Sequence, residues 1–192
     1  MKHLFLIFLL AGLAFAETNP AKFEHVKDVS SILPSGEKIL RCEAIIPTSR
    51  AELWHLLTTT EGLTSFAFPV GKIELKIGGD WESTYNVNGK LGDPNNIHNE
   101  IISYLPNEML SIRISRCPPG FPSPKVAEHI WDVMTLESVD SMHTKVTEAM
   151  CGWQNTPDDE KVYKLFDWGN RYTMEKLYER VVQGPTKWKK EK

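Results

Sequence analysis

The chain ends in the stretch PDDEKVYKLFDWGNRYTMEKLYERVVQG, residues 157–184, and this stretch decides the fold. Pro157 suits the first turn of a helix, and the acidic residues that follow place negative charge at the positive end of the helix dipole. Apolar and small residues then recur at spacings of three and four, as on the buried face of a helix: Val162, Leu165, Phe166, Gly169, Thr173, Leu177 and Val181. Gly184 and Pro185 end the pattern, so we expect one long amphipathic helix that needs an apolar surface to cover.

An antiparallel sheet is the surface that the preceding residues predict. Ile73, Leu75 and Ile77 alternate with charged residues, and comparable segments follow at about 81–87, 97–105, 109–115, 130–139 and 143–151. Turn sequences such as Gly78-Gly79-Asp80 separate these segments, which is typical of hairpins between neighbouring strands. An earlier strand over residues 38–46 stops at Pro47.

Two short helices are expected between the first strand and the hairpins. Ser49 can cap a helix over residues 50–57, with Glu52 three residues further on, and residues 61–68 predict a second helix that ends at Pro69. The order of elements therefore favours an α+β fold. We expect a curved antiparallel sheet of about six or seven strands, with its apolar face covered by the long C-terminal helix.

The N-terminus has the composition of a secretory signal peptide over residues 1–16. Lys2 and His3 precede an apolar run, and Ala14-Phe15-Ala16 offers the small residues that signal peptidase requires. We therefore expect an exported protein, periplasmic or secreted, with no stable membrane anchor after cleavage. Residues 17–35 are predicted to be irregular, residues 36–184 to form the single domain, and residues 185–192 to form a charged tail.

Composition narrows the possible functions. The 192 residues carry a net charge of -3, which gives no overall positive field for nucleic acid. No catalytic nucleophile motif, phosphate-binding loop or dinucleotide fingerprint occurs, and no cofactor is predicted. Cys42, Cys117 and Cys151 lack zinc-site spacing; in an exported protein they allow one disulfide of undetermined pairing, or free buried thiols. His98 and Glu100 could begin a metal site, but no third ligand is evident, so no metal is predicted.

Several short motifs resemble the START-like superfamily, also called SRPBCC or helix-grip proteins. They are the segment 46–54 (IPTSRAELW), the segment 61–66 (EGLTSF), the segment 78–81 (GGDW) and residues 144–147 before Cys151-Gly152-Trp153. The branch they resemble most contains the C-terminal domain of the Hsp90 ATPase activator. The resemblance spans about residues 40–182, and it departs from the family at Phe66, where a Trp is common. It implies the helix-grip fold and a hydrophobic cavity for a lipid-like or polyketide-like molecule, with no family-wide catalytic residues to transfer.

Strand alternation suggests which residues line such a cavity. If the apolar residues of segments 130–139 and 143–151 face inward, the carboxyl groups of Asp132 and Glu148 face inward with them. Aromatic side chains from residues 81–87 and from the long helix complete the candidate lining. The candidates are Trp81, Tyr85, Asp132, Met134, Leu136, Glu148, Met150 and Trp168. The alternatives are that the carboxylates lie at solvent-exposed rims or pair with Arg113 or Arg171, and that the tryptophans are core anchors.

Three hypotheses of function follow. The first is an exported protein that binds or carries a small hydrophobic molecule, with no nucleic acid partner and an undetermined oligomeric state. The second is a cavity enzyme, of cyclase or hydrolase type, that uses Asp132 or Glu148 as an acid or base. The third is a protein-interaction module related to Hsp90 co-chaperone domains, which requires a continuous exposed apolar patch.

Overall fold

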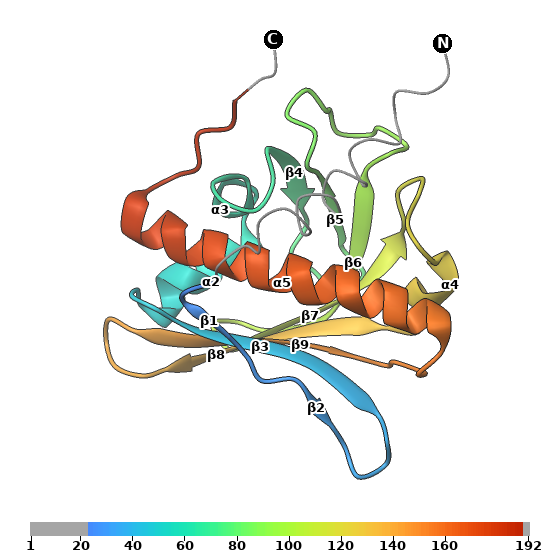
Figure 1. The fold of residues 1–192 in the computed structure, drawn as a ribbon. Helices are drawn as coiled ribbons and strands as arrows, with labels where there is room; N and C mark the ends of the chain where they lie inside the picture. The colour runs from blue at the N-terminus through green and yellow to red at the C-terminus, as the bar shows by residue number, and fades with distance from the viewer. Residues whose placement is uncertain (1–22, 190–192) are drawn as a thin grey trace.

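One long helix crosses the concave side of an open, curved sheet in the computed structural model, which describes residues 23–189 (Figure 1). Within those residues the sheet has nine strands, in the order β1-β3-β9-β8-β7-β6-β5-β4, with β2 also paired to β3. The strands are β1 (Val26–Asp28), β2 (Ser31–Ile32), β3 (Lys38–Ile46), β4 (Val70–Ile73), β5 (Asp80–Thr84), β6 (Ile97–Leu105), β7 (Met109–Arg116), β8 (Trp131–Ser138) and β9 (Thr144–Cys151). The helices are α2 (Arg50–Thr58), α3 (Thr60–Thr64), α4 (Pro124–Ala127) and α5 (Pro157–Gln183). The α+β prediction, with its long C-terminal helix across a curved sheet, is confirmed.

The sheet is larger than the sequence predicted, because β1 and β2 lie in residues that were expected to be irregular. Both strands pair antiparallel with β3, Val26 opposite Ala44 and Ser31 opposite Ile39. Strands of three and two residues are too short to show a period of two. The predicted signal peptide lies outside the described residues, and export remains a prediction. None of the helices within residues 23–189 is long and apolar enough to cross a membrane.

The short helices close one end of the sheet through the local signals that the sequence contains. The Ser49 hydroxyl accepts a hydrogen bond from the Glu52 N–H at 3.2 Å, which satisfies a free donor at the start of α2. Gly62 lets α3 lie directly on α2, since a Cβ at this position would fall 2.4 Å from the carbonyl oxygen of Leu56. Leu53 and Leu63, one from each helix, are buried in the core.

Helix α5 begins at Pro157, as predicted, and is fixed there by a buried carboxylate. Thr156 and Asp159 form a capping box, in which each side chain accepts a hydrogen bond from the other residue's backbone N–H. Asp159 also accepts from the backbone N–H of Gln154 at 3.2 Å and is 3.0 Å from Nε2 of His129. Its side chain therefore joins the helix to the chain segments on both sides of β8 and β9.

The opposite half of α5 is held by the N-terminal residues of the described chain. Glu175 is buried, and its carboxylate accepts the backbone N–H of His25 at 3.1 Å and lies 2.6 Å from Nδ1 of the same residue. The His25 ring stacks on Tyr178 with 3.6 Å between ring centroids. Beyond α5, Trp188 donates its indole N–H to the carbonyl of Thr64 at 2.7 Å, so this part of the predicted charged tail packs on α3.

Two separate hydrophobic clusters pack α5 against the sheet. The small cluster lies at the N-terminal half of the helix and consists of Leu40, Val126, Ile130, Met150, Trp153 and Val162. The large cluster receives Met174 and Leu177 from the C-terminal half, together with the buried residues of α2, α3 and most strands. The helix is thus anchored at both ends by apolar contacts.

We predict that Asp159→Asn destabilises the protein by on the order of 2 kcal/mol, because a buried capping carboxylate loses charge-assisted hydrogen bonds. Burial alone would raise the pKa of Asp159, but hydrogen bonds from His129, Thr156 and Gln154 hold that pKa well below its ordinary value. The stabilisation is therefore present above about pH 4 and is lost as the pH falls. Urea unfolding at pH 7 and pH 3 measures it.

Asp158→Asn is the matched control, because Asp158 is exposed and its carboxylate contacts only Lys161, at 2.9 Å. This change is expected to cost less than about 0.5 kcal/mol. Equal losses of stability in the two variants would contradict the role assigned to Asp159.

Candidate ligand-binding site

The middle of α5 belongs to neither hydrophobic cluster. The large cluster begins at Met174 and the small cluster ends at Phe166, so residues 167–173 bridge the gap between them. Gly169 lies in this bridge, and a Cβ built on it would meet no heavy atom within 4 Å outside its neighbours and the helix's own backbone. The helix therefore has open space beside Gly169, a residue that the sequence analysis predicts to lie on its apolar face.

Tyr85 lies across this space. It follows β5 directly, and its ring meets the edge of the Phe68 ring at 5.2 Å. Although 56% of the residue is exposed, surrounding protein atoms desolvate the phenol and raise the pKa of Tyr85 to about 12, while a hydrogen bond with Thr173 lowers it. The hydrogen bond with Thr173 places the Tyr85 hydroxyl at α5, and the charges of Tyr172 and Glu148 also act on its pKa. The Tyr85 side chain is thus accessible along part of its surface while its hydroxyl is surrounded by protein atoms.

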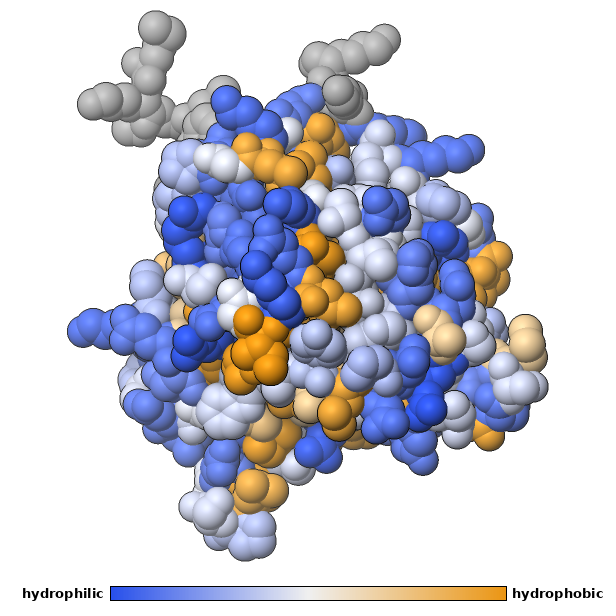
Figure 2. Space-filling model, turned by 180° about the vertical axis from the view of Figure 1, so that it is seen from behind, coloured by the Kyte–Doolittle hydropathy of each residue, from blue (hydrophilic) through white to orange (hydrophobic). Residues whose placement is uncertain are grey.

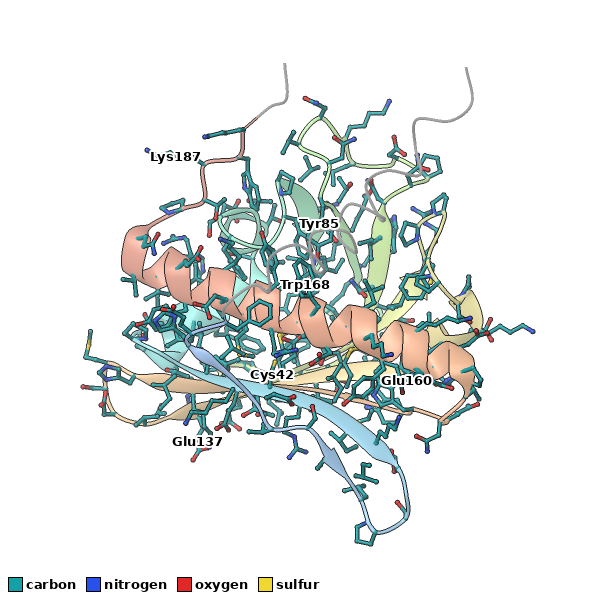
Figure 3. The ribbon with its side chains drawn as sticks, viewed as in Figure 1. Cys42, Tyr85, Glu137, Glu160, Trp168 and Lys187 are labelled. Carbon is teal, nitrogen blue, oxygen red and sulfur yellow. The ribbon has the colours of Figure 1, made fainter. Side chains whose placement is uncertain are left out.

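We call this space the interior hollow and define it by Tyr85, Gly169, Thr173 and Glu148. Gly169 and Thr173 are four residues apart and lie on one face of α5. Figure 3 shows Tyr85 and Trp168 on the side of the helix toward β5, with Cys42 between the helix and the sheet. Trp168 is half-buried and stacks on Tyr172 at 4.9 Å between ring centroids, which adds two aromatic rings near Tyr85.

The predicted carboxyl groups meet at the base of this space. Asp132 is opposite Met150 and Glu148 is opposite Met134 in the β8–β9 ladder, so the two acids are diagonal neighbours. Asp132 is 9% exposed, and burial raises its pKa to about 6 despite hydrogen bonds from Glu148 and the backbone of Val133. Burial and the neighbouring Asp132 carboxylate raise the pKa of Glu148 well above its ordinary value. Burial and mutual proximity therefore both favour the protonated form of a carboxyl group in this pair.

The sequence-based alternative, that these acids pair with arginine, is wrong. Arg113 binds Glu100 at 2.7 Å and Arg171 binds Asp167 at 2.6 Å. Among the ion pairs of residues 23–189, none involves Asp132 or Glu148. One Asp132 oxygen, Oδ1, is buried without a hydrogen-bond partner in that part of the chain.

The other sequence candidates divide between the hollow and the core. Met134 and Leu136 are buried in the large cluster on the helix-facing side of β8, and Met150 is buried in the small cluster. Trp81 is 6% exposed and packs edge-on against Phe68, which agrees with a core anchor. A ligand contact for these residues remains a prediction.

Sequence reasoning missed four residues of this region. Gly169 and Thr173 were assigned to the buried stripe, where their small size was the available signal for open space. Ser83 shares a face of β5 with Trp81 and Tyr85, and its hydroxyl has no hydrogen-bond partner in the described chain. Cys42 is opposite Glu148 on β3, and burial, followed by the charges of Glu148 and Asp132, raises the pKa of its thiol. All three cysteines carry free thiols within the described residues.

A second polar cluster lies on the other face of β5 and corrects the metal hypothesis. His98 joins Asp80 and Glu82, and not Glu100, with ligand atoms of all three residues within 4.8 Å of one another. These residues could hold a metal ion. However, Nδ1 of His98 is 2.8 Å from Asp80, and the Arg116 guanidinium contacts Nε2, so an arginine already supplies the positive charge.

Two surface grooves lie away from the interior hollow. One, of about 460 Å³, lies between the loop of residues 117–121 and α4, and another, of about 270 Å³, lies between β2 and the start of α5. Neither contains any of the eight sequence candidates. Figure 2 shows several apolar groups on the back of the molecule, with hydrophilic groups among them. The hollow is therefore the candidate site.

Comparisons with known proteins agree with this architecture. Residues 47–181 match the family model described as Activator of Hsp90 ATPase homolog 1-like protein. Similar solved structures include protein MLL2253 from Mesorhizobium loti, with a TM-score of 0.61 and 17% identity over 77% of this chain and 99% of that one. The Aha1 dimer from Colwellia psychrerythraea has a TM-score of 0.57 and 16% identity over 76% and 97% of the two chains. CalU16 from Micromonospora echinospora has a TM-score of 0.59 and 13% identity over 84% and 86%. No curated protein matches the sequence.

The raised pKa values predict how stability depends on pH. The folded state binds a proton more tightly than the unfolded chain, so the contribution of Asp132 is complete below about pH 4 and is lost as the pH rises through 6. Between pH 4.5 and 7.5 the free energy of unfolding should therefore decrease less in Asp132→Asn than in the wild type. The difference between the two decreases should be on the order of 2 kcal/mol. Urea unfolding across this range measures the difference.

Glu137→Gln serves as the control for this experiment. Glu137 is also on β8, but it lies on the side of the sheet away from α5 (Figure 3) and pairs with Lys145 in solvent. The free energy of unfolding of Glu137→Gln should change with pH in the same way as that of the wild type. A curve for Asp132→Asn that also ran parallel would contradict the proposed burial of an acid.

Proposed function

The chain belongs to the Activator of Hsp90 ATPase homolog 1-like family, and we propose that it binds a small hydrophobic molecule in the interior hollow. The observation that carries this proposal is Tyr85, which is 56% exposed and yet desolvated between β5 and α5. Binding sites for small molecules are concave, mostly apolar, and contain a few polar groups in fixed positions. The open space at Gly169, next to the rings of Trp168 and Tyr172, supports a site of this kind.

The class of ligand follows from the side chains around the interior hollow. The aromatic rings belong to α5 and to the residue after β5, buried methionine and leucine side chains come from β8, and the carboxyl pair of Asp132 and Glu148 is polar. Such walls favour a lipid-like or polyketide-like molecule with a long apolar part. A carrier needs no reacting group, and the chain has no nucleophile motif.

A cavity enzyme is the second candidate, because Asp132 and Glu148 are diagonal neighbours on β8 and β9 and burial raises the pKa of both carboxyl groups, which favours the protonated form. This is the property that a general acid needs. On this alternative, Glu148→Gln or Asp132→Asn would preserve folding and abolish turnover of a hydrophobic substrate. Unchanged turnover in either variant would remove that residue from the reaction.

We predict that Gly169→Trp weakens binding of the neutral apolar dye Nile red by about tenfold or more, since the indole would occupy the hollow and a tenfold change needs only about 1.4 kcal/mol. Dye fluorescence measures the dissociation constant, and circular dichroism checks that the helix is retained.

The matched control is Gly169→Ala, which adds one methyl group in open space. Its dissociation constant should stay within about twofold of the wild type, while stability rises by about 0.5 to 1 kcal/mol through better helix propensity. A folded Gly169→Trp protein that binds Nile red as tightly as the wild type would refute a ligand site beside the middle of α5.

A further inference from the structure

We propose that the molecule bound in the hollow carries a protonated amine, whose N–H groups bind the carboxyl pair of Asp132 and Glu148. This inference rests on the proposed function and specifies the polar end of its ligand.

The first argument is the position of the two acids. They come from adjacent antiparallel strands and face the same side as Met134 and Leu136, toward α5. Glu148 is only partly buried and lies near the Tyr85 hydroxyl, so a molecule in the hollow reaches its carboxyl group. Two carboxyl groups on one wall offer several acceptor oxygens, and an ammonium group offers up to three donors to them.

The second argument is an unsatisfied acceptor. Asp132 is 9% exposed, and its Oδ1 has no hydrogen-bond partner within residues 23–189. Buried polar atoms in folded proteins almost always have a partner, and one without a partner calls for a specific explanation. A donor on the ligand supplies that partner once the Asp132 carboxyl group turns toward the hollow.

The third argument is charge. Burial and mutual proximity make it costly for both acids of the pair to ionise unless a cation lies beside them. Arg171 is bound to Asp167 on its own helix, and Arg113 is bound to Glu100. A charge in desolvated surroundings is favourable only when it is paired. An ammonium group neutralises it, an alcohol does not, and a carboxylate adds repulsion.

Competition against Nile red with decylamine, decanol and decanoic acid at pH 7 tests the proposal, because the three chains differ only in the head group. In the wild type, decylamine is expected to displace the dye at a concentration at least about tenfold below that of decanol, with decanoic acid weakest. In Asp132→Asn/Glu148→Gln the ratio of decylamine to decanol potency should fall to about one. Glu137→Gln, on the outer side of β8, should keep the wild-type ratio.

The outcomes separate this proposal from the one it rests on. Equal potency of the three compounds on the wild type, or a ratio that persists in the double variant, overturns the amine while leaving a hydrophobic site. Failure of Nile red and of all three compounds to bind overturns the proposed function itself. If the double variant does not fold by circular dichroism, Glu148→Gln alone is measured, and an unreduced ratio in that variant overturns the proposal.

Discussion

Attachment of α5 at both of its ends is the constraint on which the rest of the structure depends. The N-terminal end is held by the buried Asp159 carboxylate and by the small hydrophobic cluster. The other half is held by Met174 and Leu177 in the large cluster and by the contacts of His25 with Glu175. Because a helix is stiff over this length, its middle must span whatever separation the curved sheet leaves beneath it.

The chemistry of the interior follows from that span. Contact between the middle of α5 and the sheet is incomplete at Gly169, and Tyr85 approaches the helix from β5 across the open space. Within residues 23–189 the carboxyl groups of Asp132 and Glu148 form no ion pair, and Arg171 pairs with Asp167 on its own helix. An open space with a desolvated carboxyl pair facing it follows from how the helix is attached.

Sequence patterns predicted the parts of this arrangement that depend on local signals. Pro157 and the acidic residues after it gave the start of α5, and the alternation in β8 and β9 placed Asp132 on the same side as Met134. Strands β1 and β2 were missed because they are too short to show a period, and they form through pairing with β3.

The partners of charged residues could not be predicted in the same way. Arg171 was a candidate partner for the interior acids, but Asp167, four residues earlier on the helix, binds it instead. His98 was paired with Glu100 in the sequence prediction, whereas the register of β5 and β6 brings it to Asp80 and Glu82. The contacts of His98 depend on the register of strands that are far apart in the sequence, whereas the Arg171–Asp167 pair is a local contact within one helix.

A crystal structure determined under xenon pressure tests the central claim most directly, because xenon occupies apolar internal spaces and leaves well-packed regions unchanged. The account predicts xenon density between Tyr85 and the middle of α5, next to Gly169 and Thr173. Side chains packed continuously across that region, with no xenon between the sheet and the helix, would contradict it.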